Sequence, residues 1–382
     1  MSMHSRSRSL PLFAVALLAL GLLGLWATSA RSQAAPVAPA ASARYLALAE
    51  QGITGQSRRW QTPTDHWYCE YLHCSTARNP YPLLTIWGIV RMFESVDAVA
   101  LAQPTAAHRG AVDRLAGQAY SLYWNRYLHG FDPYPGDDYP AAQAWFDDNG
   151  WLGLSFYDAY RATGERRWLT DAQSAFSFIA ARAWDGARGM WWNTQHSQHS
   201  GEALAAGSLL GVLLSGATRN RRDLARARTW IDWANGHDIV GDGLYGSMNP
   251  GRDTFVSYVE APLIYAQYRL CQATGVQAYC ARAARTAATL KRVYGVAYTL
   301  APLYDSIFMQ WMMAYGTATH DAHWVAVAQA NAAAATRHAT NRSGLWLGSW
   351  WGGRIGDPNT DPGMFRTMAG TTSLYAWLAY YG

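Results

Sequence analysis

The sequence predicts an all-α protein whose helices close into an (α/α)6 barrel, a toroid built from six helical hairpins. Apolar residues recur at helical spacing through most of the chain, and no stretch alternates strictly enough to predict a strand. A turn pattern also repeats, with its anchors at Trp168, Leu224, Tyr279 and Trp324. A repeat of roughly 50 residues that contains two helices is typical of stacked helical hairpins.

The helical pattern predicts twelve helices, which pair into the six hairpins. They are expected at residues 42–56, 81–103, 107–127, 143–163, 166–183, 200–216, 221–235, 254–274, 276–294, 303–318, 321–338 and 366–381. The loops between hairpins are long and rich in Gly, Trp, Asn, Asp and Pro. Because long loops in a compact domain usually carry function, we expect them to meet at one end of the ring and form a cleft.

The first residues have the pattern of an export signal. Arg6 and Arg8 precede an apolar run from Leu10 to Trp26, and small residues follow it at 28–30. The run is long enough that an uncleaved anchor is the alternative. We therefore expect a signal peptide at 1–30, a flexible leader at 31–41 and a single catalytic domain at 42–382. The mature protein is expected to be secreted or periplasmic, monomeric and without stable membrane association.

The four cysteines agree with export because they form two local pairs, Cys69 with Cys74 and Cys271 with Cys280. Such pairs are typical of disulfides in an oxidising compartment. A zinc site that adds His66 and His73 is the alternative, but the spacing fits no standard finger. The sequence thus predicts two disulfides and no metal.

Composition favours a large core and a ligand with apolar faces. Half of the residues are hydrophobic and 14% are aromatic, with 19 Trp and 23 Tyr. Aromatic rings fill cores, and they also stack on the CH faces of sugars. The net charge of +5 is mild and spread along the chain, and its densest cluster, residues 219–228, is expected to be a solvated helix face. These features argue against a nucleic-acid-binding protein.

Two adjacent acids, Asp147 and Asp148, stand at the head of the apolar helix expected at 143–163. An unpaired charge is costly to bury, so the pair needs an explanation. Cleavage of a glycosidic bond requires two carboxyl groups, and neighbouring like charges separate the pKa values of a proton donor and an ionised partner. Helix capping, for which Asp is also favoured, is the alternative interpretation.

Aromatic and polar residues near the expected helix ends are candidate sugar-binding residues. They are Trp145, Trp151, Trp191, Trp192, Asn193, Tyr245, Tyr258, Glu260, Trp350 and Trp351. Each single Trp is as readily explained by packing under a loop, and Glu260 by the favourable dipole of a helix's first turn. A second acid pair, Asp137 and Asp138, lies among Pro and Gly and predicts a solvated turn, with ion binding as the alternative.

The segment from Trp145 to Trp151, followed by residues 160–164, resembles the signature of glycoside hydrolase family 76. Residues 189–193, 242–245 and 258–279 are similar to later family segments, and residues 304–309 are more loosely so. The resemblance implies an (α/α)6 barrel and endo-α-1,6-mannanase activity on an α-linked glycan. Nothing in the sequence requires a metal or an organic cofactor, so none is expected. It also implies a retaining mechanism with Asp147 as nucleophile and Asp148 as general acid/base.

One departure is that Tyr258-Val259-Glu260 stands where the family usually has Tyr-Asn-Gln. Three other functions stay open at this point: transglycosylation at the same site, a glycan-binding toroid without turnover, and a sugar epimerase. An epimerase would use paired bases, for which the candidates are His129, His196, His199 and His237.

Overall fold

The computed structural model describes residues 39–62, 67–75, 83–136, 138–140, 142–247, 255–352 and 363–382. All of them belong to one unit, residues 35–382. The expected signal peptide and most of the expected leader lie outside the described residues. The described part folds into twelve α-helices, two 3-10 turns at Leu72–Cys74 (η1) and Gly241–Gly243 (η2), and one short hairpin of strands β1 (Trp124–Asn125) and β2 (Gly130–Phe131).

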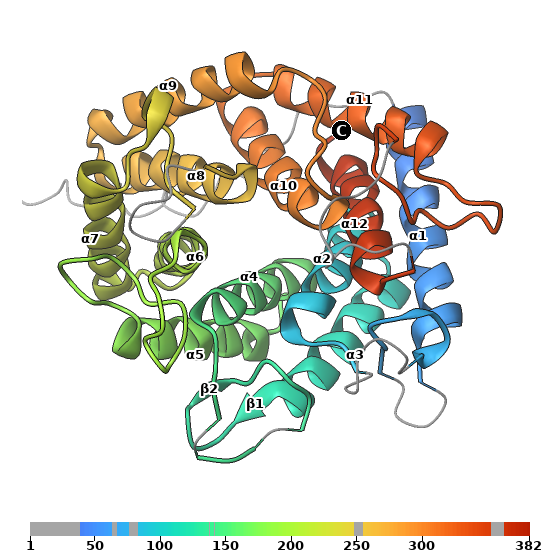
Figure 1. Cartoon of the computed structure of the whole chain (residues 1–382), viewed down its shortest axis with the longest axis horizontal. Coiled ribbons are helices and arrows are strands. Elements are labelled where there is room, and N and C mark those ends of the chain that lie inside the picture. The colour runs from blue at the N-terminus through green and yellow to red at the C-terminus, as the bar shows by residue number, and fades with distance from the viewer. Residues whose placement is uncertain are drawn as a thin grey trace, which may run out of the picture. The chain divides into compact units, whose positions relative to one another are not determined.

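Six of the helices pack side by side into a closed inner ring, which can be followed in Figure 1. They are α2 (Ile86–Ala102), α4 (Phe146–Thr163), α6 (Gly201–Thr218), α8 (Ser257–Thr274), α10 (Pro302–Thr319) and α12 (Phe365–Tyr381). Each inner helix packs against the next, and α12 packs against α2 to close the ring. Their residues are buried on nearly every face, which is the environment that an all-round apolar helix requires.

The other six helices form an outer layer around this ring (Figure 1). They are α1 (Pro39–Trp60), α3 (Ala106–Tyr123), α5 (Arg166–Arg182), α7 (Arg221–His237), α9 (Gln277–Tyr294) and α11 (His323–His338). Each buries one stripe, as α5 does with Trp168, Ala172, Ala175 and Ile179. Helix α1 covers α12, and every later outer helix covers the inner helix before it. The expected (α/α)6 barrel is confirmed.

Most helix ends lie close to the expected ones because local signals define them. The helix expected at 81–103 instead begins at Ile86, and the one expected at 42–56 continues to Trp60. Ser200 caps α6 by accepting the Ala203 N–H, and Gly164 ends α4 in the left-handed region at φ 79°. The helix expected at 107–127 is wrong at its end, since α3 stops at Tyr123. The next two residues pair with β2, and the Asn125 side chain accepts the backbone N–H of Tyr127 and Leu128.

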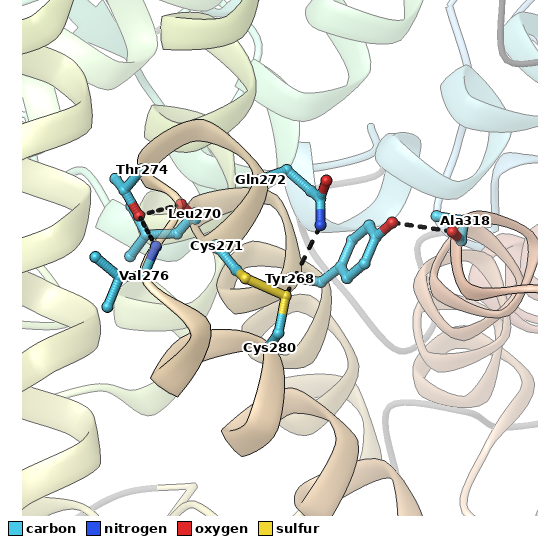
Figure 2. The surroundings of a disulfide bond; sticks show 8 residues. All are labelled: Tyr268, Leu270, Cys271, Gln272, Thr274, Val276, Cys280 and Ala318. Carbon is cyan, nitrogen blue, oxygen red and sulfur yellow. Dashed lines mark hydrogen bonds between the residues drawn. A yellow bond between two sulfur atoms is a disulfide. The ribbon is translucent and has the colours of Figure 1, made fainter.

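Both expected disulfides form. Cys69 bonds Cys74, and Cys271 bonds Cys280 across the turn that joins α8 to α9 (Figure 2). Among the described residues no group of His, Cys, Asp and Glu could hold a metal ion, and His66 lies outside them. Within the same residues one helix, α6, is long and apolar enough to cross a membrane, but 78% of its apolar window is buried inside the barrel.

Candidate active site

A cleft of about 330 Å³ lies where the inner helices begin. Its walls are Thr85, Trp87, Pro133, Tyr134, Trp145, Asp147, Asp148, Trp192, Glu202, Tyr258, Tyr304 and Arg366. Every inner helix contributes a side chain from its second or third residue. The amino ends of all six inner helices therefore converge on one cleft, which their dipoles make favourable for negative charge.

The acid pair occupies the first turn of α4. Trp145 is the residue before the helix, with extended backbone, so neither Asp147 nor Asp148 holds the N-cap position and the capping interpretation is wrong. The Phe146 N–H donates to the Trp192 carbonyl at 2.8 Å. On the other side, Asn149 Oδ1 accepts the Phe131 N–H at 2.9 Å. The helix start is thus fixed between the segment that carries Trp192 and the β hairpin.

Close packing of α4 on α6 brings a third acid to the pair. A Cβ on Gly150 would lie 2.6 Å from the Cβ of Ala206, so the two helices approach as closely as only glycine permits. This contact places Glu202, the second residue of α6, in the same cleft wall as Asp147.

Burial and like charge control the protonation of the pair. Burial, then the Asp148 carboxyl, then Glu202 raise the pKa of Asp147 well above its ordinary value, while a hydrogen bond from the Trp192 side chain opposes this. Burial also raises the pKa of Asp148 to about 7, and the charge of Arg366 opposes that rise. Two carboxyl groups in such a setting hold about one proton between them near neutral pH.

Aromatic rings form much of the remaining wall. Tyr258 stacks on Tyr304 with ring centroids 4.8 Å apart, and Trp87 lies 5.8 Å from Tyr304. Trp145 meets Trp192 edge to face at 6.2 Å. Flat apolar faces next to carboxyl groups fit a ligand with both CH faces and hydroxyl groups, which is the chemistry of a sugar.

Arg366 supplies the cation of the described cleft wall. It binds Glu70 through a buried ion pair in which both its Nε and Nη2 contact the same carboxylate oxygen. The Glu70 backbone carbonyl accepts the Phe365 N–H at 2.9 Å, which fixes the segment with η1 to the start of α12.

Several residues expected to bind sugar do not line the described cleft. Glu260 has no exposed surface, and its Oε1 accepts the Tyr245 N–H at 2.7 Å. Tyr245 is also fully buried, and its hydroxyl donates to Asn235 at 2.6 Å. Both residues join the loop after α7 to α8, and neither is among the described residues that line the cleft.

Three other tryptophans expected to bind sugar also lie outside the described lining of the cleft. Trp151 is fully buried in α4, and Trp350 is 1% exposed with its Nε1–H donated to Thr371. Trp351 is partly exposed, but its Nε1–H is bound to Asn331 at 2.6 Å.

Trp191 and Asn193 flank Trp192 without joining the described wall. Trp191 lies between His196 and His199, with centroids 4.9 and 3.9 Å away. Asn193 is 2% exposed, and its Oδ1 accepts the Gln195 N–H.

The remaining candidates lie elsewhere. None of the histidines proposed for an epimerase is among the described residues that line the cleft. Asp138 forms an exposed ion pair with Arg126 at 3.1 Å, and Asp137 lies outside the described residues.

The sequence analysis missed Glu202, Trp87, Tyr304 and Arg366 as cleft residues. Their shared signal is position, because each lies in the first turn of a helix that is apolar on every face. The pattern of alternating inner and outer helices could have identified the same position in each inner helix.

Comparison with solved structures gives several similar barrels. A family 76 α-mannanase from Bacteroides thetaiotaomicron superposes with a TM-score of 0.78 at 16% identity, over 90% of this chain and 98% of that one. A family 76 mannosidase from the same species gives 0.75 at 17% identity, over 89% and 98%. An inactive α-1,6-mannanase variant from Salegentibacter, in complex with α-1,6-mannotetrose, gives 0.70 at 14% identity, over 88% and 99%.

A search of curated proteins finds no match. The model of Glycosyl hydrolase family 76 matches residues 85–380, which include the acid pair and every inner helix except the last residue of α12. The chain is therefore a glycoside hydrolase and belongs to Glycosyl hydrolase family 76.

Proposed function

We propose that the protein hydrolyses internal α-1,6-mannosidic bonds of mannan by a retaining mechanism, outside the cytoplasm. The observation that carries this proposal is the pair of consecutive carboxyl groups at the head of α4, in a cleft walled by aromatic rings. Two family 76 relatives are named α-mannanases, and one bears the replacement of two consecutive aspartates by alanine in its inactive form. The disulfides agree with an oxidising compartment.

In the first step Asp147 attacks the anomeric carbon and forms a glycosyl ester. The bond to the leaving sugar breaks, and Asp148 gives its proton to the leaving oxygen. In the second step Asp148 takes a proton from water, the water oxygen attacks the same carbon, and Asp147 is released. Adjacent residues have Cα atoms about 3.8 Å apart, which suits the short carboxyl separation of about 5–5.5 Å in retaining enzymes.

The mechanism needs the shared proton on Asp148 and an ionised Asp147. A pKa raised to about 7 leaves Asp148 protonated over the acidic range and half protonated near neutral pH, so it can act as the acid. The donors on Asp147, the Trp192 side chain and the Asp148 backbone amide, stabilise its ionised form when the pair holds one proton.

The test is to incubate purified protein with linear α-1,6-mannan and to measure new reducing ends, with Asp147→Asn and Asp148→Asn beside it. The parent is expected to release a mixture of oligosaccharides, and each variant is expected to lose at least about 10³-fold in rate. Asp113→Asn, which changes an acid on the outer helix α3, is the matched control and should keep parental activity. Full hydrolysis by Asp147→Asn would contradict the mechanism, and products elongated on an added acceptor would indicate transglycosylation.

A further inference from the structure

Glu202 is a third carboxyl group of the cleft and has an unusual supply of donors. The Tyr258 hydroxyl donates to its Oε1 at 2.9 Å, and the Ser200 hydroxyl donates to its Oε2 at 2.9 Å. Its own backbone N–H donates as well. Each of these hydrogen bonds stabilises the ionised carboxylate, and so does the positive end of the α6 dipole.

Asp147 has fewer donors than Glu202. Its Oδ1 atom is buried and has no hydrogen-bond partner among the described residues. Glu202 faces this carboxyl group closely enough for its charge to favour the protonated form of Asp147. Because three like charges cannot all persist in one buried cleft, the proton is left to the acids with the fewest donors.

The other charged and titratable groups around the cleft do not change this distribution of charge and protons among the three carboxyl groups. From α12 comes Arg366, which is already paired with Glu70. The titratable groups contributed by α8, α10 and the loop after β2 are the phenols of Tyr258, Tyr304 and Tyr134.

Asp238, after α7, accepts the Gly246 N–H, and burial and then the charge of Glu202 raise its pKa to about 7. In α2 the wall residue is Trp87, which does not titrate. The charge of Glu202 therefore favours the protonated form of two neighbours, Asp147 and Asp238.

We propose that Glu202 is a positioning residue of this hydrolase, a hydrogen-bonded carboxylate whose negative charge keeps one proton on the Asp147–Asp148 pair and which fixes the Tyr258 hydroxyl at the cleft wall. The inference rests on the proposed function, in which that proton is the one delivered to the leaving oxygen. Glu202 touches no reacting atom in this scheme and acts through the pair.

The test is Glu202→Gln, which keeps the shape and an acceptor for Tyr258 but removes the charge. Loss of this charge lowers the pKa of Asp147. Because Asp147 and Asp148 titrate as a pair, both limbs of the kcat/KM pH profile are expected to move about one unit toward lower pH. Activity should fall about tenfold on the basic side and rise on the acidic side. A merely structural role would lower activity at every pH, and superimposable limbs would overturn the proposal.

Two further variants distinguish an effect of the Glu202 charge from an effect of lower stability. Thr105→Ala removes the cap of the outer helix α3 and costs about 1 kcal/mol of stability, but it leaves Glu202 and its donors unchanged and should leave the limbs in place. Glu202→Asn also removes the charge and should move the limbs in the same direction, so it keeps the test available if Glu202→Gln does not fold. Limbs that move with Thr105→Ala and stay with Glu202→Asn would contradict the proposal.

A titration without substrate distinguishes this inference from the proposed function. In the free protein with ¹³C-labelled aspartate, the carboxyl signals of the pair, assigned with Asp147→Asn and Asp148→Asn, should titrate about one unit lower in Glu202→Gln. If mannan is not cleaved but this shift appears, the proposed substrate is wrong and Glu202 keeps its role. If mannan is cleaved and no shift appears, the role of Glu202 is wrong.

Discussion

Arg366→Gln is expected to destabilise the fold strongly, because it leaves the Glu70 carboxylate buried without its cation. The Glu70 side chain is 3% exposed and that of Arg366 is 12% exposed, so water cannot replace the lost partner. Removing one member of a buried pair costs about 3–5 kcal/mol, against a total stability of about 5–15 kcal/mol for typical domains. Urea unfolding followed by tryptophan fluorescence measures the difference.

The double variant Glu70→Gln/Arg366→Gln is the matched control. With both charges removed no buried ion remains, so much of the loss should return, and the two single changes should be far from additive. The cost of Arg366→Gln should also shrink at low pH. Without Arg366, nothing opposes the burial that raises the pKa of Glu70. The Arg366→Gln variant therefore keeps its stability while Glu70 is protonated and loses it as pH rises through that raised pKa. Single variants that each cost under about 1 kcal/mol and add up in the double would refute the reasoning, since exposed pairs behave in that way.

Three other changes probe the barrel. Asp97→Asn should stabilise the protein at pH 7 and above, because burial raises the pKa of Asp97 and both its oxygens lack partners among the described residues. The gain should vanish near pH 4, which urea unfolding at several pH values would measure. Gly150→Ala should lower the free energy of unfolding by about 1–3 kcal/mol, because the added methyl group pushes α4 away from Ala206 on α6. An unchanged Tm in calorimetry would show that the two helices are not in close contact there. Replacing Cys271 and Cys280 by Ser should lower the free energy of unfolding by about 2–3 kcal/mol, because the disulfide closes a short loop. The parent protein, unfolded in urea with a reducing agent, should then be as unstable as the variant.

The barrel could be predicted from the sequence because its signals are local. All-round apolar helices alternate with helices that bury one stripe, and capping residues such as Ser200 and end glycines such as Gly164 mark the bounds. The end of α3 could not be predicted from local signals. Helical spacing continues past Tyr123, and the pairing of Asn125 with the β hairpin is a contact that the spacing does not contain.

The cleft was harder to predict, because it depends on which way each first-turn side chain points. Glu202 is the second residue of α6, whereas Glu260 is the fourth residue of α8. Each residue turns an α-helix by about 100°, so two positions place a side chain about 200° away. Glu202 therefore faces the cleft and Glu260 faces the loop that carries Tyr245. A sequence pattern that fixes a helix start to within two residues cannot distinguish these two acids.

The convergence of six helix starts explains why acids can work in a wall that is otherwise aromatic. Burial disfavours each carboxylate, as the raised pKa values of Asp147, Asp148 and Glu202 show. A helix amino end favours a nearby negative charge by about 0.3–1 kcal/mol, and six such ends surround this cleft. Their sum is of the same order as the cost of holding one anion there, but it falls short of the cost of three. The fold thus supports one fixed negative charge and a shared proton, which is the arrangement that we infer for Glu202 and the acid pair.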